Sequence, residues 1–392
     1  MSKTPGLAHG SDLFIFASMS SSIRATTLII MVLVAHLAAG EANRAVPTNT
    51  VQTLETIRKK YDFPALAVVV VKDGVICDRA AVGVRKHGEP VAITTNDVFH
   101  IGSCTKSMTA TVAAISIEEG KLHWDTTISE VFPEQKDSMN QQYQNVTVEQ
   151  LLQHRGGVPG APPPDAWKRA WEQKGTSTEQ RYEFIRAVLR NPPEGPPGTK
   201  CIYSNQGYAV VGAILEKITG MPWETLMRQR LFKPLKMNSA GFGVPGTNDK
   251  VDQPWGHTRK LLITVPIQAD NPPAIGPGGT VHCSLDDLAV YAIAHMKGER
   301  EGGLLKPETF RRLHTSPHGG DYACGWSCCE RGWAGGIALT HNGSNTFWYV
   351  VMWLAPKKDF AVIVGTNTGV NDAFKGCDDV AAQMIHKWLP AK

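Results

Sequence analysis

The stretch that decides the fold is FHIGSCTK, residues 99–106. It places Ser103 and Lys106 three residues apart, at the expected start of a helix over Thr105–Glu119. Two helical side chains at that spacing share a face, with Cβ atoms about 5–6 Å apart, so the amine can reach the hydroxyl. A serine hydroxyl needs an adjacent base to attack a carbonyl, and a buried lysine with a lowered pKa supplies one. The helix N-terminus adds the Ser103 backbone N–H as an oxyanion donor.

The S-x-x-K pattern is short, and a second interpretation is open at this point. A serine at the N-cap followed by a solvated lysine gives the same letters. Cys104 lies between the two residues and invites a mechanism that uses its thiol. The next residue on a helix points about 100° away, so we predict that Cys104 packs inward instead.

Strand patterns lie on both sides of this stretch. On the N-terminal side, a β-rich run over Ala65–Val71, a turn at Asp73-Gly74 and a second run over Val75–Val82 predict an antiparallel hairpin. An amphipathic helix is predicted just before it, over Thr50–Tyr61. The C-terminal candidates are strands at Ile337–His341, Thr346–Leu354 and Phe360–Gly365, followed by a helix over Asp372–Trp388.

The middle of the chain shows helical patterns separated by proline-rich loops, one of them at 272–279. Helices are predicted over Val148–His154, Tyr208–Thr219 and Asp286–Met296, the last with Ser284 as its N-cap. Strands at both termini with helices between them predict an α+β fold, in which one antiparallel sheet is built from both chain ends and flanked by helices. We expect a sheet lobe at about 50–102 and 331–390, and a mostly helical inserted lobe at about 103–330.

The first forty residues carry an export pattern. An apolar run over Thr26–Ala39 follows Arg24 and ends in small residues, as a signal peptide does. The run is shorter than the roughly 20 residues that a membrane-spanning helix needs. We predict cleavage of residues 1–40, export to the periplasm or beyond, and no stable membrane span afterwards. An uncut signal anchor is the alternative.

The composition excludes several classes of function. The 40 Lys+Arg against 36 Asp+Glu residues give a net charge of only +4, too weak a field for nucleic-acid binding. A hydrophobic content of 42% excludes intrinsic disorder. The 8 cysteines form no C-x-x-C pair, so we predict no metal site, at most one or two disulfides, and thiols that are mostly buried as small apolar groups.

Two further segments change the interpretation of S-x-x-K. Tyr203-Ser204-Asn205 stands about 100 residues later, before an apolar helix, and His341-Asn342-Gly343 follows a candidate strand near the end of the chain. This order resembles the serine β-lactamase and penicillin-binding protein superfamily, which carries S-D-N and K-T-G in those two places. The tyrosine resembles the class C β-lactamase branch, which also contains D-amino-acid peptidases and carboxylesterases.

Supporting segments extend the resemblance over about residues 50–388. LLQHRGGVP (residues 151–159) resembles the family segment that lies beneath the site, and Gly278-Gly279 resembles its Gly-Gly loop. Because several segments match in the right order, a chance S-x-x-K is implausible. The resemblance implies a β-lactamase/transpeptidase-like fold, with residues 41–392 as one serine hydrolase domain.

The resemblance also implies a role for each motif residue. Ser103 would attack the substrate carbonyl and become acylated, while Lys106 and Tyr203 would share the general-base and proton-shuttle work. A free phenol has a pKa of about 10, and nearby cations would favour its phenolate. Asn205 would orient Lys106 and the acyl amide. The second oxyanion donor would be the backbone N–H of Ser344.

The other implied contacts bind substrate, and Gly343 would let its strand approach the substrate closely. The predicted substrate-binding residues are Gln153, Gly278, Gly279, Asn342 and Gly343. No metal or organic cofactor is implied. The chain has no H-E-x-x-H and no G-x-S-x-G pattern, which argues against a zinc metalloprotease and a conventional α/β-hydrolase.

His341 is the main departure from the pattern, because β-lactamases generally carry lysine in its place. An imidazole is mostly neutral at pH 7 and attracts an anion less than an ammonium does. We therefore predict a weaker preference for carboxylated β-lactams, although His341 would still contribute to catalysis. Histidine at this place is familiar among the esterases and peptidases of the family. A histidine that is merely buried and hydrogen-bonded is the alternative.

The predicted function is an exported serine hydrolase with an acyl-serine intermediate, acting on a small-molecule or short-peptide ester or amide. Carboxylesterase activity ranks above β-lactamase activity, and D-amino-acid peptidase activity comes third. The alternative is a penicillin- or peptide-binding homologue with little or no turnover. No nucleic-acid partner is predicted, and the oligomeric state is left open.

Overall fold

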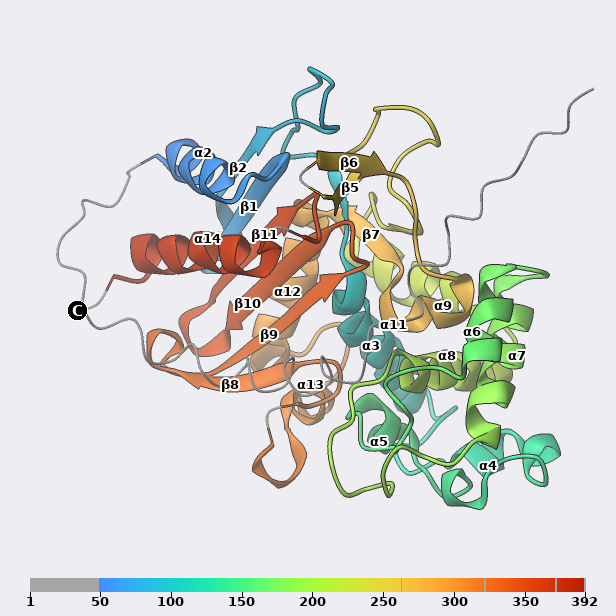
Figure 1. The fold of residues 1–392 in the computed structure, drawn as a ribbon. Coiled ribbons are helices and arrows are strands. Elements are labelled where there is room, and N and C mark those ends of the chain that lie inside the picture. Colours follow the sequence, from blue (N-terminus) through green and yellow to red (C-terminus); the bar gives the residue numbers. More distant parts are fainter. Residues whose placement is uncertain (1–48, 262, 321, 371, 391–392) are drawn as a thin grey trace, which may run out of the picture. The chain divides into compact units, whose positions relative to one another are not determined.

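The central sheet of the protein is made from both ends of the chain. The computed structural model describes residues 49–390, except 262, 321 and 371, so the predicted signal peptide lies outside the described residues. Within them, an antiparallel six-stranded sheet has the order β2-β1-β11-β10-β9-β8 (Figure 1). The predicted α+β arrangement, with β1 and β2 from one end beside β9 to β11 from the other, is confirmed.

The strands are β1 (Ala65–Lys72), β2 (Val75–Gly83), β3 (Val98–His100), β4 (Gly241–Phe242), β5 (Gly256–Lys260), β6 (Ile263–Ile267), β7 (Val281–Ser284), β8 (Ser327–Arg331), β9 (Gly336–Ser344), β10 (Tyr349–Ala355) and β11 (Phe360–Thr366). The α-helices are α2 (Thr50–Tyr61), α3 (Thr105–Glu118), α4 (Ile128–Val131), α5 (Val148–Leu152), α6 (Pro164–Trp171), α7 (Ser177–Arg190), α8 (Asn205–Thr219), α9 (Trp223–Met227), α10 (Lys233–Leu235), α11 (Gly276–Gly279), α12 (Leu285–Glu301), α13 (Pro307–His314) and α14 (Ala373–Trp388).

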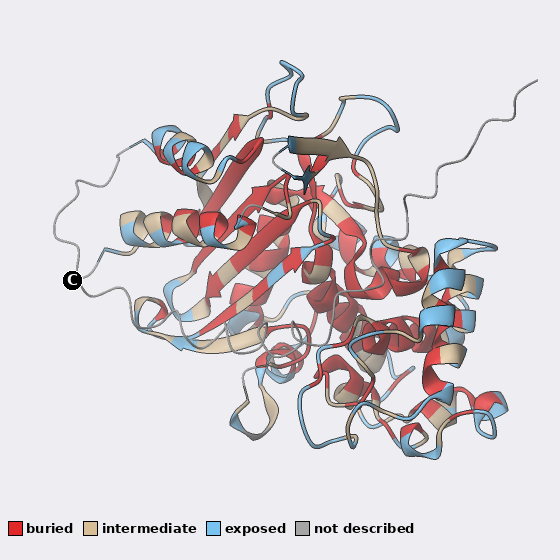
Figure 2. Cartoon of the chain, in the orientation of Figure 1, coloured by how far each residue is buried: buried red, intermediate tan, exposed pale blue. Residues whose placement is uncertain are grey.

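Both faces of the sheet are covered, which is why β1 reads as an unbroken apolar run (Figure 2). Val68 and Val70 point into a core shared with α2 and α14. Val69 and Val71, one residue out of phase, point into the larger core shared with α3 and α12. This larger core supports the start of α3, where Ser103 lies.

The middle of the chain contains more strand than predicted. A three-stranded sheet has the order β3-β7-β4, β5 pairs with β6, and β8 joins the central sheet although it begins before the boundary predicted at 331. The loop predicted at 272–279 holds the short helix α11. The described residues form one compact unit by their internal contacts.

Two element boundaries differ from the sequence prediction in a way that matters for the site. β9 continues through Ser344 instead of ending at His341, so the His341-Asn342-Gly343 motif is on a strand, paired with β10. α8 begins at Asn205 instead of Tyr208, because the Ser204 hydroxyl accepts a hydrogen bond from the Gly207 N–H at 3.1 Å and caps the helix. Ser284 caps α12 as predicted.

Candidate active site

The hydroxyl of Ser103 is presented by a sharp turn between β3 and α3. Ser103 lies in a single 3₁₀ turn, Gly102–Cys104, and is partly exposed. Gly102 has φ +50°, and a Cβ on it would lie 2.3 Å from the backbone nitrogen of Ser344. Only glycine fits there, so the turn depends on a residue that is part of the GSCTK pattern itself.

Lys106 extends from the first turn of α3 toward the Ser103 hydroxyl and is fully buried. Its Nζ lies 3.0 Å from Ser103 Oγ, 2.6 Å from Asn205 Oδ1 and 2.6 Å from the Gly278 carbonyl oxygen. All three partners are uncharged. Burial therefore lowers the pKa of Lys106 to about 7, against a small opposing effect of the Cys104 thiol.

Tyr203 covers the same amine from the other side. Lys106 Nζ lies 4.7 Å from the centre of its ring. The residue is 41% exposed, yet its hydroxyl is enclosed by protein, and burial raises the pKa of Tyr203 while its hydrogen bond with Ser103 lowers it less. Tyr203 is thus a neutral phenol at pH 7, not the phenolate that nearby cations would favour.

His154 supports the segment that carries Tyr203. Its carbonyl oxygen accepts from the Ile202 N–H at 2.7 Å, and its Nδ1 accepts from the Ser204 N–H at 3.2 Å. Its ring lies 4.4 Å from the Tyr203 ring, centre to centre. Burial, with the nearby Lys106, lowers the pKa of His154 far below its usual value, so it supports Tyr203 as a neutral ring.

The Gly-Gly segment of α11 closes the site behind Lys106. The Gly278 carbonyl is an acceptor for the amine, and a Cβ on Gly278 would lie 3.2 Å from the Asn205 carbonyl oxygen. A Cβ on Gly279 would lie 3.6 Å from the Gly102 carbonyl carbon, so the two backbones are close to each other. The predicted pair thus lies in the site, where it contacts the motif residues, and its role in substrate binding stays a prediction.

β9 runs against the turn that carries Ser103. A Cβ on Gly343 would lie 2.0 Å from the Ile101 carbonyl oxygen and 2.4 Å from the Ser103 nitrogen. Glycine at 343 is therefore required by the contact between the two backbones. The contact brings the backbone nitrogen of Ser344 beside the Gly102–Ser103 segment, where two N–H groups can serve one oxygen atom.

His341 is buried on the same strand, with 5% of its surface exposed. Its Nδ1 lies 2.6 Å from the Asn342 carbonyl oxygen and its Nε2 lies 3.0 Å from the Tyr322 hydroxyl. Nδ1 therefore carries the proton, and Nε2 accepts from the tyrosine. Burial, helped by the nearby Lys106, lowers the pKa of His341 to about 3, so the imidazole is neutral at physiological pH.

Two predicted substrate-binding side chains are not brought to Ser103. Asn342 lies between two inward positions of β9, is exposed, and donates to the Tyr349 hydroxyl at 2.9 Å. That hydroxyl belongs to the core on the other face of the sheet. Gln153 is buried, and its side chain hydrogen-bonds with the Cys324 thiol. Neither side chain is thus placed beside Ser103, because motif letters do not say which way a side chain points, and their role in substrate binding stays a prediction.

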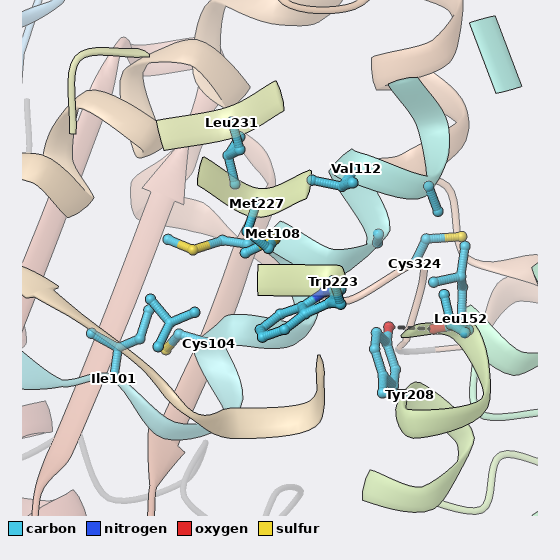
Figure 3. Packing of buried hydrophobic residues seen from close by; sticks show 14 of the residues in the cluster. Ile101, Cys104, Met108, Val112, Leu152, Tyr208, Trp223, Met227, Leu231 and Cys324 are labelled. Carbon is cyan, nitrogen blue, oxygen red and sulfur yellow. Dashed lines mark hydrogen bonds between the residues drawn. The ribbon is translucent and has the colours of Figure 1, made fainter. Parts of the chain in front are cut away.

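Cys104 packs inward, as predicted. It is fully buried beside Ile101 and Met108, in a cluster that also contains Trp223 (Figure 3). Its thiol faces the His341 carbonyl oxygen, and burial raises the pKa of Cys104 strongly. A protonated thiol in an apolar cluster is a packing group, not a nucleophile.

Tyr322 is the site residue that the sequence analysis missed. It is half-buried, its ring packs against the rings of His154 and Tyr203, and its hydroxyl donates to His341 Nε2. It lies in an irregular segment before β8, at no fixed spacing from any motif, so no pattern in the sequence signals it. In the part of the chain that the structure describes, no three His, Cys, Asp or Glu side chains gather as a metal site would require.

Comparisons with known proteins agree on one family. The sequence model of the family described as Beta-lactamase matches residues 50–383. Penicillin-binding protein 4 of Amycolatopsis lactamdurans is 26% identical over 346 residues, 82% of this chain and 86% of that protein. A putative D-alanyl-D-alanine carboxypeptidase of Escherichia coli (strain K12) is 31% identical over 253 residues, 60% of this chain and 56% of that protein.

A solved structure agrees at the level of the fold. The penicillin binding protein from Bacillus halodurans superposes with a TM-score of 0.70 at 22% identity, covering 86% of this chain and 100% of that one. The structure is therefore of the predicted β-lactamase/transpeptidase type. Since the family match extends over most of the chain, the protein belongs to the Beta-lactamase family of serine β-lactamases and penicillin-binding proteins.

Proposed function

We propose that this protein is a serine hydrolase that acylates Ser103 and hydrolyses an ester or amide. One observation carries the proposal: the buried amine of Lys106 meets the Ser103 hydroxyl and two oxygen acceptors. A carbonyl and an amide oxygen can only accept, so they take two N–H bonds from Nζ. A neutral amine then directs its remaining lone pair at the Ser103 hydroxyl, as a general base must.

The electrostatics favour that neutral form. An ammonium at this place would be buried beside uncharged partners, which is why the pKa of Lys106 falls to about 7. About half of the molecules then carry the free amine at neutral pH. Tyr203 keeps its proton in the same range, because burial raises its pKa. The base is therefore Lys106, and Tyr203 is a proton carrier beside it.

Acylation follows from these positions. Lys106 Nζ takes the Ser103 proton as Oγ forms a bond to the substrate carbonyl carbon, and the carbonyl π electrons move to the oxygen. The backbone N–H groups of Ser103 and Ser344 stabilise that oxyanion. When the tetrahedral intermediate collapses, the bond to the leaving group breaks. The leaving alcohol or amine receives a proton from the Tyr203 hydroxyl, which Lys106 reprotonates.

Deacylation uses the same groups in the opposite direction. A water molecule loses its proton to the amine of Lys106 and attacks the ester carbonyl of acyl-Ser103. The oxyanion again lies at the two backbone N–H groups. Collapse releases the acid, and Ser103 Oγ regains its proton. The proposed cycle uses the side chains of Ser103, Lys106 and Tyr203, the two backbone N–H groups and water.

We propose carboxylesterase activity above β-lactamase activity because of His341. Its Nδ1 proton is held by the neighbouring carbonyl and its Nε2 accepts from Tyr322, so the neutral ring offers a substrate carboxylate neither a charge nor a free N–H. A β-lactam or a peptide with a free carboxylate would lose a charge-assisted bond there. An uncharged ester loses nothing.

A second function keeps support from the relatives, one of which is named as a penicillin-binding protein. Such a homologue would acylate Ser103 and then deacylate very slowly. We place it second, because the same free amine that activates Ser103 is available to activate water. Intact-mass measurements after mixing with benzylpenicillin separate the two: a lasting adduct supports binding, and its disappearance with release of product supports turnover.

The test of the proposed function compares Ser103→Ala with Ser116→Ala, both on or beside α3. Ser116 is buried and donates only to the Val112 carbonyl oxygen of its own helix. We expect Ser103→Ala to lose Ser103-dependent hydrolysis of p-nitrophenyl acetate and Ser116→Ala to keep it. Full activity of Ser103→Ala contradicts the proposal. Efficient turnover of nitrocefin with negligible esterase activity reverses the order of substrates.

We also propose export, from the apolar run in the first forty residues. Among the described residues, no helix combines the length and the apolar character that crossing a bilayer requires. N-terminal sequencing of the protein recovered after expression of the full chain checks this proposal. A chain that retains its first residues and stays with the membrane fraction supports the uncut anchor instead.

A further inference from the structure

A buried histidine lies directly behind the turn that carries Ser103. His100, the last residue of β3, is fully buried. Its Nδ1 accepts a hydrogen bond from the Gly102 N–H at 3.2 Å. A ring nitrogen that accepts carries no hydrogen, so the proton of the neutral imidazole is on Nε2. Nε2 lies 2.9 Å from Asp270 Oδ2, an ion-pair distance, although the ring N–H is not aligned with that oxygen well enough for a hydrogen bond.

The other carboxylate oxygen of Asp270 accepts hydrogen bonds, one of them from the segment that follows Ser344. Its Oδ1 accepts from Asn345 Nδ2 at 3.1 Å and from the Asn271 N–H at 2.7 Å. Asn345 follows Ser344 directly and is buried, with 5% of its surface exposed. Its own Oδ1 accepts from the Phe347 N–H at 3.2 Å and from the N–H of the residue after it at 3.3 Å, which fixes the turn between β9 and β10.

The two segments that meet at Asp270 are the two that carry the backbone donors of the site. Gly102 precedes Ser103, and Asn345 follows Ser344. Between them the backbones are in direct contact at Gly343. A single carboxylate thus contacts a side chain from each segment, a histidine at 2.9 Å and an asparagine through a hydrogen bond. Among the described residues, neither side chain hydrogen-bonds with the Ser103 hydroxyl or with Lys106.

The proton position on His100 depends on Asp270. The carboxylate charge 2.9 Å from Nε2 favours a proton on that nitrogen, which leaves Nδ1 free to accept from Gly102. In serine hydrolases with a catalytic histidine, a carboxylate behind the histidine selects the tautomer of the imidazole in the same way. Here, however, the controlled group is a backbone amide next to Ser103, and the imidazole does not touch the reacting atoms.

We propose that Asp270 is a positioning residue that fixes both oxyanion donors. Through His100 it holds the segment of the first donor, and through Asn345 it holds the segment of the second. The proposal rests on the proposed function, because an oxyanion exists only if Ser103 attacks a carbonyl. It adds to that function three positioning residues, Asp270, His100 and Asn345, to which the sequence motifs assign no role.

The substitution Asp270→Asn tests the proposal with almost no change of shape. If the new amide group faces His100, the imidazole proton moves to Nδ1 and opposes the Gly102 N–H. If it faces Asn345, two donors oppose each other there. Either orientation leaves a buried donor unpaired. We expect kcat/KM for p-nitrophenyl acetate to fall by about 10- to 100-fold, since loss of one oxyanion donor costs about 100- to 1000-fold.

A thionoester distinguishes misplaced donors from a general loss of structure. Sulfur accepts hydrogen bonds weakly and lies farther from carbon than oxygen does, so p-nitrophenyl thionoacetate gains less from the two N–H groups. We expect Asp270→Asn to reduce the ratio of ester to thionoester rates by a factor similar to its loss of ester activity. If both rates fall together and the ratio is unchanged, or if neither falls, the proposal is wrong.

A matched control removes a carboxylate elsewhere. Asp78 accepts from Thr50 and Lys387 on the other face of the sheet, at 2.5 and 2.8 Å. Asp78→Asn should destabilise the protein and leave the ratio of the two rates unchanged.

Two substitutions of His100 keep the proposal testable if Asp270→Asn does not fold. Asparagine has an acceptor bonded to Cγ, as the histidine ring does, so His100→Asn retains a partner for the Gly102 N–H. His100→Gln can reach Asp270 but leaves that N–H without its acceptor. We expect the rate ratio to stay within about fivefold of the wild-type value for His100→Asn and to fall by about 10- to 100-fold for His100→Gln.

Equal ratios for the two His100 variants would overturn the proposal. Failure of the proposed function gives a different result, because the wild-type protein would then show no hydrolysis that depends on Ser103.

Discussion

The two sides of Ser103 are built in different ways. On the proton-transfer side, Lys106 and Tyr203 are side chains from separate elements, and burial sets the pKa of each. On the oxyanion side, the proposed donors are the backbone N–H groups of Ser103 and Ser344, whose places depend on two glycines and on buried side chains behind them. A defect on the first side should change the pH profile. A defect on the second should lower the rate and leave the pH midpoint unchanged.

Removal of the amine should give the largest effect. We expect Lys106→Ala to lower kcat/KM for p-nitrophenyl acetate by about 1000-fold, because a positioned general base contributes about 100- to 10,000-fold. Lys136→Ala, at an exposed position, is the matched control and should keep wild-type activity. A loss below tenfold for Lys106→Ala would mean that another group accepts the Ser103 proton.

The pH profile of the wild-type protein should show the pKa of Lys106. The active form is the neutral amine, so activity rises with pH and levels off above the pKa of about 7. Between pH 5 and pH 7 we expect kcat/KM to increase about 50-fold, as the neutral fraction does. Asp270→Asn should lower the whole curve without moving its midpoint. If the midpoint of that variant shifts by a full pH unit, Asp270 acts on the protonation of Lys106, and the proposed separation of the two sides is wrong.

A cation at position 341 should change substrate preference. We expect His341→Lys to raise the ratio of nitrocefin to p-nitrophenyl acetate turnover by about tenfold, since a charge-assisted bond to a carboxylate contributes about 1.5–3 kcal/mol. The added charge should also lower the pKa of Lys106 and move the pH profile to lower pH. His341→Asn adds no charge and should not raise the ratio. If the ratio rises equally in both variants, the size of the side chain at position 341 controls the substrate preference, and its charge does not.

The smallest effect is expected from the thiol of Cys104, which lies between Ser103 and Lys106 in the sequence. Cys104 is buried in the apolar cluster beneath both sides. We expect Cys104→Ala to reduce the free energy of unfolding by about 1 kcal/mol, measured by urea denaturation, and to change kcat by less than about twofold. A loss of activity as large as that of Lys106→Ala would show that the thiol takes part in the chemistry.

The difference between the proton-transfer side and the oxyanion side also explains how much of the site could be predicted from the sequence. The motif residues on the proton-transfer side act through their own side chains at characteristic spacings, and the structure brings Ser103, Lys106, Tyr203 and Asn205 together. The sheet from both chain ends was also predictable, because the apolar runs and the Asp73-Gly74 turn are local signals.

The oxyanion side gives no such signal. Asp270 lies 170 positions after His100, and only the folded chain makes them neighbours. Asn342 and Gln153 match the family motifs, but their side chains hydrogen-bond with Tyr349 and Cys324 instead of lying beside Ser103. The direction of a side chain depends on strand register and on partners distant in sequence. Tyr322 has no fixed spacing from any motif, although its hydroxyl hydrogen-bonds with His341 Nε2.

The central claim is that Ser103 becomes acylated with Lys106 as its base. The most direct measurement is the intact mass, followed by peptide mapping, of protein quenched soon after mixing with p-nitrophenyl trimethylacetate, an ester whose bulky acyl group slows deacylation. The account predicts one acyl group on the peptide that contains Ser103, none in Ser103→Ala, and slow labelling in Lys106→Ala. An adduct at another residue, or ester hydrolysis by Ser103→Ala at the wild-type rate, would contradict it.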